Sequence, residues 1–175
     1  PQGIATTIWQ TSPTRDNQEE FRRLNLLAEI FGDRLREEIR EKLGASYSPN
    51  AGAGGSDALE NMGYIISQSI GKPEDLDLLL NTMRDLADKL ATDGATEDEL
   101  DRALKPVLGM LDKSLRDNGY WLSTVMSQCQ ADPKRLDLAR NRDSDYKSIT
   151  LKEINGLARK YLAAENTLLV TIKPK

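Results

Sequence analysis

Apolar residues recur with two different spacings along this chain of 175 residues, and the spacings predict both strands and helices. β-Branched and aromatic residues are dense over residues 4–11, 62–70 and 167–172, and such runs are typical of strands. The longest helical stripe recurs every three or four residues and consists of Phe21, Leu24, Ala28, Phe31, Leu35 and Ile39. The chain is therefore predicted to begin with a strand that leads into a long amphipathic helix.

The predicted elements follow the order β-α-β-β-α-α-α-α-α-β. In that order they cover residues 4–11, 17–43, 45–56, 62–70, 73–93, 96–118, 120–130, 134–141, 150–161 and 167–172. Strands concentrated in the first half, with one returning at the end, predict an α+β fold. We expect a mostly antiparallel four-stranded sheet with helices packed on one face. No linker-like composition or internal repeat divides residues 1–175, so a single domain is expected.

Composition narrows the classes of function. The formal net charge of −4 argues against nucleic acid as a partner, because phosphate binding requires a basic face. No apolar run approaches the roughly 20 residues needed to span a bilayer, so no membrane span is predicted. The chain starts at Pro1 without a signal-peptide pattern, and we expect it to be a fragment of a longer protein.

Histidine is absent from the sequence. Imidazole is the usual base at physiological pH and the commonest ligand of catalytic zinc. A Ser-His-Asp triad, a Cys-His dyad and a histidine-based zinc site are therefore excluded within this chain. Cys129 is the only cysteine, so no internal disulfide is possible, and without a histidine to activate it an unreactive thiol is expected.

The remaining polar clusters favour local structural roles. Gly52, Gly54 and Gly55 precede a predicted strand and not a helix, which favours a hairpin over a phosphate-binding loop. The acidic residues 97–101 lie in a first helical turn, where carboxylates are favourable, and Thr96 with Glu99 has the spacing of a capping box; Thr150 with Glu153 repeats it. Asp143 and Asp145 lack the pattern of a calcium loop and are expected to be solvated.

The stretch LREEIREKLGASYSP, residues 35–49, is the most distinctive. A charged helix keeps its apolar spacing through Leu35, Ile39 and Leu43 and then ends at Gly44, which can adopt the left-handed conformation of a helix terminus. Arg40 in the last turn could simply complement the helix dipole, and Tyr47 could pack at the rim of the sheet. Spacing alone favours these local roles over a binding site.

This stretch resembles a signature of the pitrilysin/insulinase family of zinc metallopeptidases. In the C-terminal half of those enzymes a helix ends in a pattern close to R-L-x-x-x-[LI]-R-E-x-x-G-x-x-Y-S, and this chain has Arg34-Leu35, Ile39-Arg40-Glu41, Gly44 and Tyr47-Ser48. The order of elements and the later helix start TEDELDRA are similar too, so the resemblance extends over essentially the whole chain.

The resemblance implies that this chain is the non-catalytic C-terminal half of a two-half zinc endopeptidase. The catalytic half would hold the zinc, and the two halves would enclose a chamber for a peptide substrate. It implies that Arg40 and Tyr47 contact the substrate near the metal, where a guanidinium fork and a phenol O–H can bind carbonyl oxygens and developing negative charge. This half alone would contain no catalytic residue, metal or cofactor and would be inactive.

The resemblance also leaves a second function open. Some relatives keep the fold without proteolysis and serve in assembly, so a scaffold subunit is the alternative. The expected partner is the catalytic half, in the same protein or as a separate subunit, and the surface that meets it could let the isolated chain form a homodimer. Bacterial relatives often act in the cell envelope, which favours the periplasm or envelope over the cytoplasm.

Overall fold

The computed structural model describes residues 1–13, 17–46, 48–56, 59, 62–127, 129–130 and 132–174. Four strands form one sheet: β1 (Gly3–Gln10), β2 (Asn50–Gly55), β3 (Gly63–Gly71) and β4 (Thr167–Ile172). Their order across the sheet is β2-β3-β1-β4, and all neighbours are antiparallel. The predicted α+β fold with an antiparallel four-stranded sheet is confirmed.

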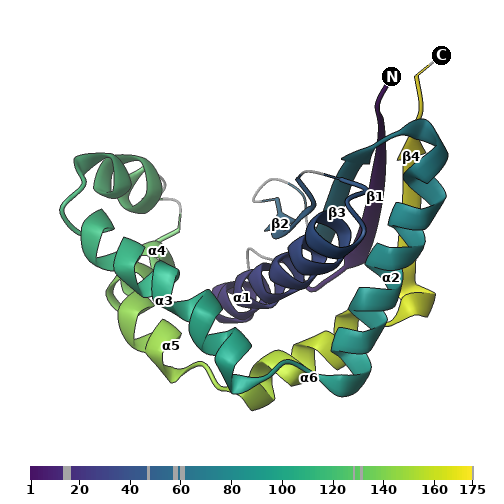
Figure 1. The fold of residues 1–175 in the computed structure, drawn as a ribbon. Coiled ribbons are helices and arrows are strands. Elements are labelled where there is room, and N and C mark those ends of the chain that lie inside the picture. Colours follow the sequence, from purple (N-terminus) through teal and green to yellow (C-terminus); the bar gives the residue numbers. More distant parts are fainter. Residues whose placement is uncertain are drawn as a thin grey trace.

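The helices follow in chain order and include two π-helical turns. They are α1 (Gln18–Leu35), η1 (Arg36–Lys42), η2 (Pro73–Asp75), α2 (Leu76–Asp93), α3 (Glu97–Ser114), η3 (Tyr120–Met126), α4 (Lys134–Arg140), α5 (Arg142–Ser148), α6 (Leu151–Tyr161) and η4 (Ala164–Asn166). Figure 1 shows α3, α4 and α5 extending away from the sheet as an arm, while α1, α2 and α6 stay close to it. No helix in the described ranges is long and apolar enough to cross a membrane.

The core lies between the sheet and helices α1 and α2. Odd-numbered residues of β1 and β3 point toward the helices and are buried, as the alternation of a strand requires. Trp9 on β1 meets Phe31 on α1 edge to face, with ring centroids 5.7 Å apart. Beside them the hydroxyls of Thr7 and Ser67 are 2.6 Å apart in a buried cross-strand pair, so these two polar groups satisfy each other.

The opposite face of the sheet carries apolar side chains that the helices leave partly open. The even-numbered positions are Ile4, Ile8, Tyr64, Ile66, Ile70, Leu168, Val170 and Ile172, each of them half-buried or exposed. The strand register places them side by side, with Ile4 opposite both Ile70 and Ile172. We call these eight residues the open face.

Some elements differ from those predicted. The helix predicted over residues 120–130 is the shorter π-helix η3, which ends at Met126. The second strand begins at Asn50 and not at residue 45; Gly44 has a φ of +61°, and Pro49 has no N–H for a sheet ladder. Helix α5 was not predicted, because its sequence RDSDYKS contains a single large apolar residue and no helical stripe. Helix α5 is instead attached to α1 by its acidic side chain Asp145.

Candidate functional site

The charged helix of the signature ends in a π-helical turn. The Leu43 N–H donates to the Glu38 carbonyl at 3.0 Å, five residues back along the chain, and the helix then ends at Gly44 as predicted. Ala45 N–H also reaches back to the Ile39 carbonyl at 3.1 Å. π-Helical segments are rare and are often found at functional sites, and this one, η1, contains the predicted substrate residue Arg40.

Arg40 is exposed at this turn, whereas its neighbour Ile39 is completely buried. Leu35, one turn earlier, is buried as well, so core packing of the adjacent apolar stripe fixes the backbone at Arg40. The guanidinium is thus presented to the surface from a firm support, which is what a preorganised contact requires.

Tyr47 lies outside the described residues, so its expected convergence with Arg40 stays a prediction. The residues around it are described: Ser46 and Pro49 are buried and Ser48 is exposed. The chain therefore passes close to the core on both sides of this position before it enters β2.

Arg34, which the same signature contains, has a structural role. Its Nε donates to Glu99 at 2.7 Å, and one of its terminal nitrogens donates to the Gly94 carbonyl at 2.8 Å. Glu99 also completes the predicted capping box with Thr96 at the start of α3. The hydrogen bond from Arg34, assisted by those from Thr96, lowers the pKa of Glu99 from 4.5 to about 2, although burial opposes the shift. This contact joins the end of α1 to the start of α3.

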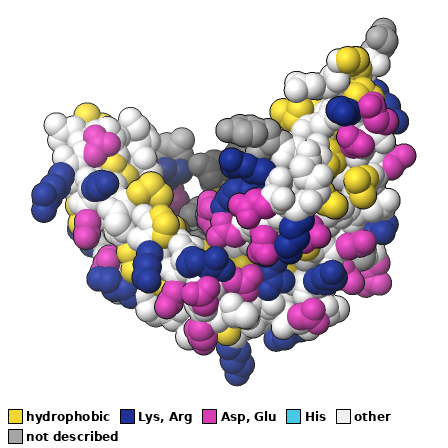
Figure 2. Space-filling view, viewed as in Figure 1, with side chains coloured by type: hydrophobic (Ala, Val, Ile, Leu, Met, Phe, Trp, Pro, Cys, Tyr) yellow, Lys and Arg dark blue, Asp and Glu magenta, His cyan; other side chains and the backbone are white. Residues whose placement is uncertain are grey.

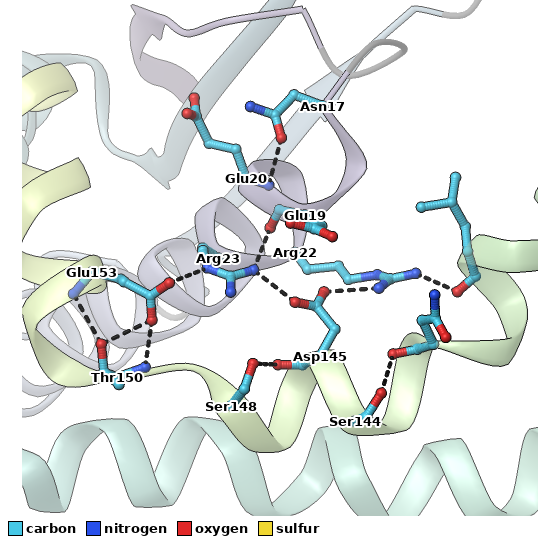
Figure 3. A network of polar contacts seen from close by, with 12 residues as sticks. Asn17, Glu19, Glu20, Arg22, Arg23, Ser144, Asp145, Ser148, Thr150 and Glu153 are labelled. Carbon is cyan, nitrogen blue, oxygen red and sulfur yellow. Dashed lines mark hydrogen bonds and ion pairs between the residues drawn. The ribbon is translucent and has the colours of Figure 1, made fainter. Parts of the chain in front are cut away.

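The expectation that Asp145 is solvated is wrong. Its carboxylate is largely buried and accepts from Arg22 at 2.7 Å and from Arg23 at 2.9 Å, as Figure 3 shows. Arg22 also donates to the Leu138 carbonyl at 2.7 Å, and Arg23 donates to Glu153 at 2.9 Å. Asp143, by contrast, pairs with Lys147 on the surface.

This network attaches the arm to the first half of α1. Burial opposes the charge of Arg23, but hydrogen bonds to Asp145 and Glu153 outweigh it and raise the pKa of the guanidinium. In Figure 3 the two arginines extend from α1 toward α5 and the start of α6. The buried charges of this network are paired with each other, so we assign the network a structural role in holding the helices together.

A second polar cluster lies at the other end of α1 from Arg40. Glu20 Oε1 accepts from Ser12 at 2.5 Å and from Tyr161 at 2.6 Å. Burial opposes ionisation of Glu20, but these two hydrogen bonds and Lys160 lower its pKa. A nearby depression of about 430 Å³ is lined by Asn17, Glu19, Glu20, Arg23, Glu153, Gly156, Leu157 and Lys160. Because Glu20 pairs with Lys160 and Arg23 pairs with Glu153, we assign this depression no binding role.

The residues of this chain do not fit a zinc site. Zinc in proteins is held by several histidine, cysteine or carboxylate ligands, and no histidine is present in the sequence. Across the part of the chain that the structure describes, no three histidine, cysteine, aspartate or glutamate side chains are grouped so as to hold a metal ion. The half-buried Cys129 is the sole cysteine.

The view of Figure 2 shows how charge and shape are distributed on one side of the molecule. Acidic and basic side chains are interspersed there, and a hollow separates the arm from the part that contains the sheet. Large apolar residues are exposed on the arm and on the segment that joins α3 to α4, namely Met110, Leu115, Trp121, Leu122, Met126 and Leu136. The sequence analysis did not identify these residues as exposed, nor did it identify the open face of the sheet. A signal for the open face was available, because apolar residues occupy both even and odd positions of residues 4–9.

The chain matches one family model and several curated proteins. A family model described as the peptidase M16 inactive domain matches residues 1–107. Among curated proteins, the chloroplastic stromal processing peptidase of Pisum sativum is 26% identical over 132 residues, which are 74% of this chain and 10% of that protein. The Arabidopsis thaliana protein of that name is 26% identical over 134 residues. The chain thus spans about a tenth of the length of the curated relatives that it matches.

Solved structures with lower identity share the fold. The inactive peptidase domain of a candidate zinc protease from Bordetella parapertussis is 18% identical with a TM-score of 0.81, covering 100% of this chain and 94% of that one. The periplasmic protease PqqL from Escherichia coli is 20% identical with a TM-score of 0.75, covering 99% of this chain and 19% of that one. A chain of Complex III from Candida albicans is 12% identical with a TM-score of 0.76, covering 98% of this chain and 43% of that one.

Proposed function

Because the chain belongs to the family of peptidase M16 inactive domains, we propose that it is the non-catalytic lobe of a zinc-dependent endopeptidase. It closes a chamber together with a catalytic lobe and contributes Arg40 and Tyr47 to the binding of a peptide substrate. We further propose that residues 1–175 act as one domain in this role.

The observation that carries the proposal is the exposed Arg40 on its π-turn. Burial of Leu35 and Ile39 fixes the backbone at Arg40, so only the side chain has to be ordered when its guanidinium fork binds a substrate carbonyl or carboxylate.

The zinc of such an enzyme would be held by the catalytic lobe, since the residues of this chain do not fit it. The open face of the sheet supports a large protein partner: apolar patches of this kind on soluble proteins commonly mark interaction surfaces. We propose that the catalytic lobe, in the same protein or as a separate subunit, covers this face. A compartment in the periplasm or cell envelope has the support of the fold shared with periplasmic PqqL, whereas the curated relatives are chloroplast proteins.

A scaffold is the second candidate function. The fold shared with a chain of Complex III supports it, because that structure is not described as a peptidase. A scaffold needs the partner surface but does not need Arg40 or Tyr47, so the two functions make different predictions for the same variants.

The test is peptide cleavage by the full-length protein that contains this chain. We expect Arg40→Ala and Tyr47→Phe each to lower kcat/KM by about 100-fold, the scale for losing a donor that stabilises transition-state charge. Lys152→Ala on α6 and Tyr120→Phe on η3 are the matched controls, an exposed cation and a phenol that both lie outside η1 and outside the open face. Full activity of both site variants would refute the substrate role, and a wild-type protein that assembles with its partner but cleaves nothing would favour the scaffold.

A further inference from the structure

Two buried serine hydroxyls near the start of β2 have no partner within the protein. Ser69 on β3 is completely buried, and Ser46, which lies between η1 and β2, is 6% exposed. Neither hydroxyl has a hydrogen-bond partner among the described residues. Ser67, on the same face of β3, shows the usual state of a buried serine, because its hydroxyl pairs with that of Thr7 at 2.6 Å. An orphaned buried hydroxyl lowers stability, so both Ser46 and Ser69 require a partner.

The two serines are brought to the same region because the segment that contains Ser46 runs along β3. The carbonyl oxygen of Ala45 is 3.1 Å from the position that a Cβ on Gly71 would occupy, and β2 starts opposite Gln68. Between these two points the segment passes Ser69, which is buried on the same side of β3 as Gly71. Ser46 directly follows Ala45, so its hydroxyl lies near that of Ser69 without a direct hydrogen bond between them.

Few main-chain hydrogen bonds hold this segment. Among its described residues, Ala45 donates to the Ile39 carbonyl at 3.1 Å, and Pro49 has no N–H to donate. Two hydrogen bonds of about 2.8 Å let one water molecule bridge hydroxyl oxygens up to about 5.5 Å apart. Buried waters in proteins satisfy polar groups of this kind and are costly to remove. One water between Ser46 and Ser69 would therefore give both hydroxyls a partner and tie the segment to the sheet.

We propose that Ser46 and Ser69 hold one buried water between their hydroxyls and that this water anchors the segment to β3. Ser46 directly precedes Tyr47. The two serines are therefore positioning residues for the substrate-binding phenol, a role that rests on the proposed function. The water fixes the main chain next to Tyr47, as a preorganised contact requires. Ser46 and Ser69 act through Tyr47 and not by contact with the substrate.

A double-mutant cycle on this chain tests the shared water independently of any activity. Ser46→Ala and Ser69→Ala should each lower the folding equilibrium constant from urea denaturation about tenfold, because each leaves the other hydroxyl and the water with a bond fewer. The double variant should lose about tenfold as well, since the two hydroxyls share one water. Ser46→Ala combined with Ser67→Ala is the matched control and should be additive, because Ser67 bonds to Thr7. Additive losses for Ser46 and Ser69, or no loss in either single variant, would overturn the shared water.

Peptide cleavage by the full-length protein tests the positioning role. Ser46→Ala should lower kcat about tenfold at unchanged KM, and it should have no further effect in a Tyr47→Phe background, because it acts through the phenol hydroxyl. A loss that persists in the Tyr47→Phe background, or an unchanged kcat of Ser46→Ala, would overturn this role. If Tyr47→Phe alone changed nothing, the proposed function would fail, whereas the buried water would still be decided by the stability cycle.

Discussion

The ion pair between Arg34 and Glu99 should make a large and pH-dependent contribution to stability. Both side chains are mostly buried, with 21% and 14% of their surfaces exposed. The pKa of Glu99 falls from 4.5 to about 2 on folding, chiefly because of Arg34. A shift of this size corresponds to about 3 kcal/mol at pH 7, where the carboxylate is ionised in both the folded and the unfolded chain.

The sign of the pH dependence follows from the lowered pKa. Above about pH 5 the full contribution of Glu99 is present, and it is lost as the pH falls toward 2, because the unfolded chain takes up the proton first. Glu99→Gln keeps an oxygen that can accept from the N–H of Thr96, so the capping box is largely retained. The variant therefore isolates the charge that faces Arg34.

The assay is urea denaturation followed by circular dichroism at pH 7, 5, 4 and 3. We expect Glu99→Gln to lower the free energy of unfolding by about 3 kcal/mol at pH 7 and by progressively less at each lower pH. Glu97→Gln, an exposed acid in the same helical turn, should change it by less than about 0.5 kcal/mol. A Glu99→Gln effect that is the same at pH 7 and pH 3 would refute the assignment of the shift to Arg34.

Two further predictions concern the attachment of the arm and the packing of the sheet. Asp145→Asn should lower the free energy of unfolding by about 3 kcal/mol, because Arg22 and Arg23 then lose their shared carboxylate in a largely buried site. Amide hydrogen exchange should increase first in α5. Unchanged protection of α5 would contradict the role of Asp145. Gly63→Ala should destabilise by about 3 kcal/mol or more, since the new Cβ would collide with the backbone of Ser12. Gly52→Ala, where a Cβ meets open space, should be neutral or slightly stabilising. Equal decreases in the melting temperatures of the two variants would refute this packing argument.

Features that depend on neighbours in sequence could be predicted, and features that depend on distant residues could not. The long helix with its buried stripe, its end at Gly44 and both capping boxes follow from spacings of a few residues, and all are confirmed. Helix α5 was missed because RDSDYKS has no stripe. It is held instead by Asp145, whose partner Arg22 lies 123 positions away, and a single sequence does not reveal such a pairing.

The candidate site was predictable to a similar degree. Its arginine and the end of its helix could be located from a local motif, and the structure confirms that Arg40 is exposed at that end. The π-turn could not be anticipated, because its apolar spacing is compatible with an ordinary α-helix. The open face also escaped prediction, since strand order decides which apolar residues become neighbours across a sheet.

The two arginines of the signature show why residue type alone does not reveal a role. Arg34 directly precedes buried Leu35, and Arg40 directly follows buried Ile39, so the two lie on opposite flanks of the apolar stripe. One flank faces α3 and pairs Arg34 with Glu99, whereas Arg40 on the other flank is exposed. Under the proposed function, Arg34→Ala should lower the stability of the full-length protein more than its peptidase activity, and Arg40→Ala should lower the activity more than the stability. Urea denaturation and peptide cleavage measured on both variants check this, and the opposite order of effects would contradict the division.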